Sequence, residues 1–163
     1  IPDMLTFAKG VGNGITLAGI VGRAEIMDTL PHLSFSTFGG NPLSTAAGLA
    51  TLRYVKEADL QGNAKARGQQ MKDRLTPVAE RTDWIAELRG KGLMQAIETV
   101  HPSSIEPDPK AAKMLLEHAK DRGLLIGKGG LYGNVLRLTP MLNITEAEMD
   151  DGLDALIAAI DSV

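Results

Sequence analysis

Lys9 begins a glycine-rich segment that could carry covalent chemistry. It follows the apolar residues 4–8 and precedes glycines at positions 10, 12 and 14. A lysine amine attacks a carbonyl only when it is neutral, and its ordinary pKa is about 10.4. An apolar strand that buries the lysine stem would favour the neutral amine, and glycines let a flat ligand approach the backbone. An ordinary loop lysine fits the same residues, so the segment alone leaves both readings open.

Neither glycine cluster of the sequence matches a phosphate-binding motif. A P-loop requires G-x-x-x-x-G-K-[ST]. The nearest candidate, around Lys128, has Arg122 where the first glycine should stand. A dinucleotide fingerprint requires G-x-G-x-x-G, and its third glycine position is taken by Ile15 in one cluster and Tyr132 in the other. Phosphate loops of both kinds are therefore excluded as the reason for the glycines.

The composition excludes several further classes of site. The chain has 163 residues, of which 44% are hydrophobic and 23% charged, and its formal net charge is −3. This is typical of a soluble globular chain with no electrostatic preference for nucleic acid or a membrane surface. There is no cysteine, which excludes disulfides and thiolate catalysis. The three histidines form no metal-ligand motif. We therefore expect a cytoplasmic protein without a metal site, a nucleic-acid partner or a membrane partner.

Apolar periodicity and capping signals predict the elements of the first half. Residues 4–8 and 17–22 favour strands, and a short helix is expected from about Ala24. Asn41 can cap a helix whose first residue is Pro42. The side chains expected to face inward from this helix, and from a second helix over about 63–79, are Leu43, Ala46, Ala47, Ala50, Met71, Leu75 and Val78.

The second half carries stronger helix boundaries. Asp108 and Pro109 predict a helix start, and Gly123 predicts its end. Thr145 and Glu148 form a capping box before a last apolar stripe. The expected strands are 84–89, 93–98, 124–127 and 135–138, and the expected stripe is Met149, Leu153, Leu156, Ile157 and Ile160.

These elements predict a division of the chain into three parts. Residues 1–45 have the pattern of a piece of a larger α/β domain, and residues 83–163 that of a small α+β domain. Residues 46–82 would supply the connecting helices. The expected fold class is α/β.

Four segments together resemble a known family over essentially the whole chain. They are PDMLTFAKGVGNGITLAGIVGRAEIMD, STFGGNPLSTAAGLATL, LRGKGLMQAIE and GNVLRLTPMLNITEAEMD, in this order. The chain resembles the class III aminotransferases, subgroup II of the fold-type I pyridoxal phosphate enzymes. The segments HLSFSTFGGNP and DRGLLIGKGGLYGNVLRLTP look most like the alanine–glyoxylate aminotransferase branch.

The resemblance implies roles for three residues. Lys9 matches the lysine that binds pyridoxal 5′-phosphate as a Schiff base and then moves a proton between substrate and cofactor. Thr37 matches the threonine that reaches the cofactor phosphate of the neighbouring subunit. Arg137 matches the arginine that grips the substrate carboxylate, for which its bidentate fork is suited. Its alternation with Leu136 and Leu138 also predicts that Arg137 faces away from those leucines.

The implied activity is transamination between an amino acid such as alanine and a 2-oxo acid such as glyoxylate. It would proceed by ping-pong kinetics through pyridoxamine phosphate in a homodimer or higher homo-oligomer. The family's main phosphate loop and ring-nitrogen acid lie upstream of the matching residues. We therefore expect a C-terminal part that is inactive alone. Two alternatives stay open: another fold-type I reaction, such as an omega-amino acid transaminase, an aminomutase or a decarboxylating enzyme, or a non-catalytic dimerisation module.

Other conspicuous residues have structural interpretations. Residues 89–92, Arg-Gly-Lys-Gly, predict a tight turn between two strands. Trp84 is expected in the core or at an interface, and His32 in packing near the candidate site. Lys128 is expected in a flexible loop near the arginine strand, where substrate contact is conceivable.

Overall fold

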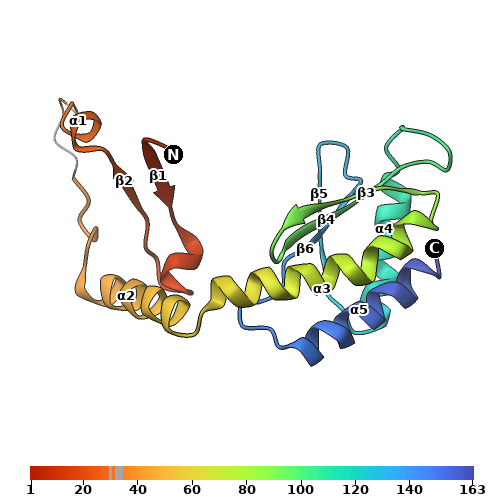
Figure 1. Ribbon diagram of the computed structural model, residues 1–163. Coiled ribbons are helices and arrows are strands. Elements are labelled where there is room, and N and C mark those ends of the chain that lie inside the picture. Colours follow the sequence, from red (N-terminus) through yellow and green to blue (C-terminus); the bar gives the residue numbers. More distant parts are fainter. Residues whose placement is uncertain (30, 32–34) are drawn as a thin grey trace. The chain divides into compact units, whose positions relative to one another are not determined.

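The structure is a computed structural model that describes residues 1–29, 31 and 35–163. It divides into two compact units, unit 1 (Ile1–Asp59) and unit 2 (Leu60–Val163), which are described separately (Figure 1). His32, for which packing was expected, lies outside the described residues. Among the described residues no helix is both long and apolar enough to cross a membrane, and no three metal-ligating side chains gather into a cluster.

Unit 1 contains a short antiparallel ribbon and a helix. The strands β1 (Met4–Phe7) and β2 (Gly19–Gly22) pair so that Phe7 lies opposite Gly19. A Cβ at Gly19 would lie 2.5 Å from the Phe7 ring, so a larger residue here would displace that ring. The 3-10 helix η1 (Lys9–Gly12) lies between the strands in sequence, and the short helix α1 (Ala24–Met27) follows them. All three elements expected in residues 1–28 are therefore present.

The helix α2 (Pro42–Glu57) begins where the sequence predicts. The Asn41 side chain accepts a hydrogen bond from the backbone N–H of Ser44 at 3.0 Å. The predicted inward face is wrong, because Leu43 is 71% exposed and the buried residues are Ser44 and Gly48. A Cβ at Gly48 would lie 2.4 Å from a Leu17 methyl group. Small residues therefore make the close contact, whereas the apolar stripe of α2 stays open in this unit.

Unit 2 is a four-stranded antiparallel sheet with three helices. In chain order its elements are α3 (Leu60–Glu80), β3 (Ile85–Lys91), β4 (Met94–Thr99), α4 (Pro109–Asp121), β5 (Gly127–Gly129), β6 (Val135–Leu138) and α5 (Glu146–Ile160). The strand order is β3-β4-β6-β5, and α3 and α5 run beside each other next to the sheet (Figure 1). The core between sheet and helices contains Leu75, Ile97, Leu115, Leu136 and Leu156, all nearly inaccessible to solvent.

Both predicted helix caps of unit 2 are present. The Asp108 carboxylate accepts hydrogen bonds from the backbone N–H groups of Lys110 at 2.8 Å and Ala111 at 3.0 Å. Thr145 and Glu148 form the reciprocal capping box of α5. The predicted stripe of α5 is confirmed for its four buried members, and Ile157 is partly buried. Trp84 packs partly buried against the same core.

A close approach fixes α3 to the turn between β3 and β4. A Cβ at Gly68 of α3 would lie 2.3 Å from the carbonyl oxygen of Gly92 in that turn. Gly92 itself has φ +55°, a conformation that L side chains rarely adopt. The predicted turn therefore exists, but β3 extends to Lys91 and the chain reverses at Gly92 and Leu93.

Two expectations around β5 are wrong. The third strand of the sequence analysis, 124–127, lies instead at Gly127–Gly129. Lys128, expected in a flexible loop, is therefore a strand residue paired with Leu136. The apolar residues 124–126 misled the prediction, because Leu124 and Ile126 pack against the core without joining the sheet, whereas Leu125 is exposed.

Candidate functional site

Lys9 occupies an unusual backbone position between β1 and η1. Its φ is +55°, and the preceding residue, Ala8, is fully extended. The left-handed conformation costs a non-glycine residue about 1–2 kcal/mol, and such strain is most frequent at active and ligand-binding sites. The Lys9 side chain is exposed and, among the described residues, makes no hydrogen bond or ion pair. Its amine is therefore available to a ligand, although the burial expected for it is not provided within unit 1.

The glycines after Lys9 leave space beside it. A Cβ at Gly10 or at Gly14 would meet no atom within 4 Å. The short helix η1 is held by its own turns, in which the backbone N–H of Asn13 donates to the carbonyl of Gly10 at 3.1 Å. The approach of a flat ligand to this backbone stays a prediction, and the open space at Gly10 and Gly14 is consistent with it.

Thr37 lies in the turn that precedes α2. The backbone N–H of Gly39 donates to the carbonyl of Ser36 at 3.2 Å, and Gly40 follows with φ +68°. The Thr37 side chain is exposed and, within the described part of the chain, its hydroxyl has no hydrogen-bond partner. Its neighbours Phe35 and Phe38 are 83% and 81% exposed. The turn thus presents a free hydroxyl between two uncovered aromatic rings.

Arg137 lies on β6 and faces away from the core, as predicted. Leu136 and Leu138 on either side of it are 0% and 5% exposed, whereas Arg137 is exposed. Its register partners are Ala96 on β4 and Gly127 on β5. A Cβ at Gly127 would lie 3.4 Å from the Arg137 Nε. Small neighbours on both sides therefore leave the guanidinium open, and it makes no ion pair with any residue that the structure describes.

A second arginine on the same sheet face is already paired. Arg89 on β3 lies opposite Ala96, and it forms ion pairs with Glu98 and with Glu87. The hydrogen bond from Arg89 holds the pKa of the Glu98 carboxyl below its ordinary value, and Asn134 adds a hydrogen bond at 3.3 Å. The same hydrogen bond to Glu98 raises the pKa of Arg89. Arg89 therefore has its charge compensated, and Arg137 does not.

The sequence analysis missed the Arg89–Glu98 pair and the glycines beside Arg137. Arg89 and Gly127 were predicted as the last residues of the strands 84–89 and 124–127, and no partner was predicted for either residue. The alternation of small and charged residues across the β3–β4 hairpin was the available signal, because facing strands bring such residues together.

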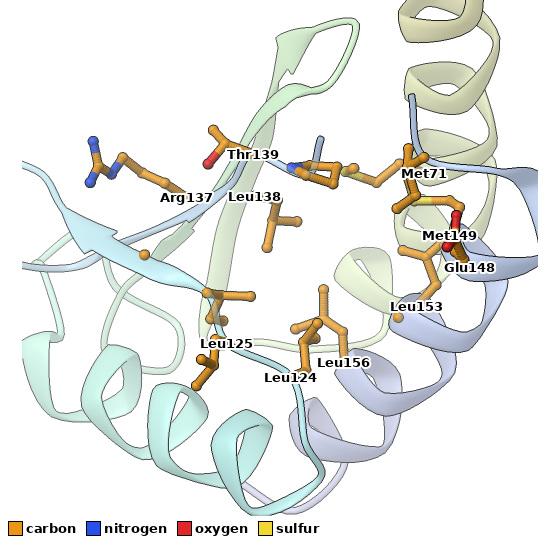
Figure 2. A pocket seen from close by; sticks show the side chains of 15 residues that line it. Met71, Leu124, Leu125, Arg137, Leu138, Thr139, Glu148, Met149, Leu153 and Leu156 are labelled. Carbon is orange, nitrogen blue, oxygen red and sulfur yellow. The ribbon is translucent and has the colours of Figure 1, made fainter. Parts of the chain in front are cut away.

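A pocket of about 180 Å³ is lined by Arg137 and Leu138 of β6, together with apolar side chains of α5 and of the residues that precede β5. Figure 2 shows Leu138 directed toward the apolar side chains of the cavity, whereas the Arg137 guanidinium points away from them. The candidate carboxylate site and the cavity therefore lie on opposite faces of one strand.

The structure places the three candidate residues in two units. Lys9 and Thr37 belong to unit 1, and Arg137 belongs to unit 2. Among the described residues no hydrogen bond joins Lys9 to Thr37. Each residue is thus presented separately, with its functional group free.

Comparisons with known proteins identify the family. A family profile described as "Aminotransferase class-III" matches residues 1–160. The chain is 41% identical over 163 residues to the mitochondrial alanine–glyoxylate aminotransferase 2 homolog 2 of Arabidopsis thaliana, covering 99% of this chain and 33% of that protein. It is 39% identical to 4-aminobutyrate aminotransferase of Mycobacterium leprae, covering 96% of this chain and 35% of that protein. The chain therefore belongs to the class III aminotransferases.

Solved structures agree with this assignment. A phospholyase from Arthrobacter in complex with phosphoethanolamine superposes with a TM-score of 0.94 at 35% identity, covering 100% of this chain and 39% of that one. The fold is thus the corresponding part of a fold-type I pyridoxal phosphate enzyme, which confirms the predicted α/β class. The chain spans about a third of the length of the curated relatives it matches.

Proposed function

We propose that the whole protein is a pyridoxal phosphate-dependent aminotransferase that moves an amino group from an amino acid such as alanine to a 2-oxo acid such as glyoxylate. The choice of substrate class rests on Arg137, whose guanidinium has no ion-pair partner among the described residues. Arg89, on the same face of the sheet, is already paired with Glu87 and Glu98. A free arginine fork suits a substrate carboxylate.

Lys9 is the proposed covalent attachment point for the cofactor. Bound pyridoxal phosphate supplies an electron sink for negative charge at the substrate α-carbon. Lys9 is exposed and has a left-handed backbone conformation, and its amine would bind the cofactor. Once the amino donor has displaced it, the same amine would move the proton of the substrate α-carbon. The open space at Gly10 and Gly14 suits the flat ring.

Thr37 and Arg137 have distinct proposed roles. The free hydroxyl of Thr37 would donate a hydrogen bond to the cofactor phosphate of a neighbouring subunit. The Arg137 fork would hold the substrate carboxylate with two hydrogen bonds, which would also fix the orientation of the α-carbon. The competent enzyme would therefore be a homodimer or a higher homo-oligomer.

A second candidate is a different reaction on the same scaffold. The similarity to a phospholyase in complex with phosphoethanolamine favours it, because that ligand carries no carboxylate. An assay of the full-length enzyme with amino acids, matched simple amines and phosphoethanolamine separates the two. Amino transfer from alanine to glyoxylate supports our proposal, and elimination of phosphate without amino transfer contradicts it.

A further inference from the structure

A pocket that is partly open to solvent lies in unit 2, behind the strand that carries Arg137. The cavity of about 180 Å³ lies between β6, α5 and the residues that precede β5. Figure 2 shows the side chains of Leu124, Leu138, Leu153 and Leu156 converging on it. Apolar side chains that line a pocket open to solvent stay in contact with water until an apolar occupant covers them.

The walls of the pocket are mostly apolar. The polar side chains that line it belong to Arg137, Thr139 and Glu148. Arg137 points away from it (Figure 2), and the Glu148 carboxylate already accepts hydrogen bonds from the backbone N–H of Thr145 at 2.8 Å and from its hydroxyl at 2.7 Å. A buried water needs about two to four polar partners. The lining therefore favours an apolar occupant.

The size and the rim of the cavity suit a small molecule. An enclosed apolar cavity of about 150 Å³ binds benzene or xenon, and this pocket, which is partly open to solvent, is slightly larger. At the rim, Leu125 is 84% exposed. On the α5 wall Gly152 has no side chain, and a Cβ there would meet only a Leu124 methyl group, at 3.9 Å. Access and volume are thus both provided.

We infer that this cavity binds a small uncharged apolar molecule of about the size of benzene. The inference is independent of the proposed aminotransferase activity, because none of the proposed catalytic contacts is made in the cavity. A charged or strongly polar ligand is disfavoured, since it would lose hydration without gaining partners.

Xenon is the most direct probe. Crystals of the full-length protein pressurised with xenon are expected to show density within contact distance of Leu138, Leu153 and Leu156. Xenon bound only elsewhere, or not bound at all, would overturn the inference. The second outcome would also arise if another part of the full-length chain fills the cavity, and the inference fails in that case too.

Benzene and a pair of leucine variants provide the solution test. Benzene is expected to raise the melting temperature of the full-length protein in a saturable manner. The variant Gly152→Leu places a side chain in the cavity and is expected to abolish the shift, whereas Asp151→Leu, at an exposed neighbouring position of α5, keeps it. If Gly152→Leu does not fold, Leu124→Phe fills the cavity from the opposite wall. An equal benzene shift in the filled variant and the control would contradict the inference.

Discussion

Arg89 and Arg137 carry the same group on one face of the sheet of unit 2. Both lie in register with Ala96 of β4, which stands between them, and directly paired residues share a face. Two carboxylates compensate Arg89, whereas Arg137 is flanked by alanine and glycine. A desolvated anion gains most from a charge that has no other partner. The difference between the two arginines therefore selects Arg137 as the candidate carboxylate ligand.

The first prediction concerns the Arg137 fork. Arg137→Lys keeps the charge but loses the bidentate geometry. We expect kcat/KM for alanine and glyoxylate to fall by about 10²-fold, equivalent to about 3 kcal/mol. Cofactor binding should hardly change. Steady-state kinetics with an amino acid and a matched simple amine provide the measurement, and Arg89→Lys is the matched control. Equal losses for both substrates would mean that Arg137 supports the fold and does not grip a carboxylate.

The second prediction concerns Lys9. Lys9→Ala removes the amine that is proposed to bind the cofactor and to move the proton, so turnover of the full-length enzyme should fall below detection. Borohydride should fix the cofactor covalently to the wild-type chain but not to this variant. Lys56→Ala, in the last turn of α2, controls for the loss of one lysine in unit 1. A Lys9→Ala enzyme that transaminates at a near-normal rate would refute the assignment.

At the scale of the elements, helix boundaries were the most predictable feature. Asn41, Asp108 and Thr145 cap their helices as the sequence predicts, because a cap depends on local hydrogen bonds between neighbours in the chain. The orientation of Arg137 followed from the alternation of a single strand for the same reason. Local patterns thus predicted both the caps and the orientation of one candidate site residue.

Features that depend on distant partners were not predictable. Predicting which face of α2 stays open would require knowing that Gly48 contacts Leu17. The shift of β5 to Gly127–Gly129 depends on its pairing with β6, since a strand exists only where a partner accepts its hydrogen bonds. The left-handed conformation of Lys9 has no signal in its own residue type, because lysine normally avoids it.

The third prediction concerns the cap of α4. Asp108→Ala removes the acceptor for two backbone N–H groups and should destabilise the protein by about 1 kcal/mol. Asp108→Asn retains an oxygen acceptor and should lose much less. Urea unfolding at neutral pH provides the measurement. A loss for Asp108→Asn as large as that for Asp108→Ala would show that the charge, and not the cap, is what stabilises the helix.

The same residue carries a pH dependence. Burial opposes ionisation of Asp108, but hydrogen bonds from Ala111 and Lys110, with the nearby His101, together lower its pKa from the ordinary 3.8. A carboxyl whose pKa is lower in the folded state stabilises that state above the unfolded pKa, and this contribution is lost as the pH falls through the folded value. Wild-type stability should therefore fall more steeply below about pH 4 than that of Asp108→Asn.

The fourth prediction compares two glycines that lie inside helices of unit 2. Gly68→Ala would place a Cβ 2.3 Å from the carbonyl oxygen of Gly92, so α3 and the β3–β4 turn must separate. Overpacking of this kind typically costs about 1–3 kcal/mol. Gly152→Ala meets no atom closer than 3.9 Å and should stabilise α5 by up to about 1 kcal/mol. Thermal unfolding of the two variants should therefore shift in opposite directions, and a stabilised Gly68→Ala would contradict the close approach.

At the scale of the whole molecule, the surroundings of Thr37 bear on the proposed shared site. Its hydroxyl is free in the described part of the chain, and the adjacent Phe35 and Phe38 rings are almost fully exposed. Exposed aromatic side chains of this kind are enriched at protein–protein interfaces. The three-part division at residues 45/46 and 82/83 stays a prediction for the complete protein, whereas this chain alone divides between Asp59 and Leu60.

The fifth prediction tests the subunit to which Thr37 contributes. Thr37→Ala should weaken cofactor binding by about 1–3 kcal/mol, or roughly 5- to 150-fold, since one hydrogen bond to a charged group is lost. Thr37→Ser keeps the hydroxyl and is the control. Mixed dimers of Lys9→Ala and Thr37→Ala subunits then separate the two arrangements. If Thr37 serves the neighbouring subunit, one of the two sites receives a native Lys9 and a native Thr37, so about half of the wild-type activity returns at limiting cofactor. If Thr37 serves its own subunit, no native site forms and the activity stays at the level of the single variants, which would contradict the shared site. A full-length enzyme that sediments as an active monomer would contradict it as well.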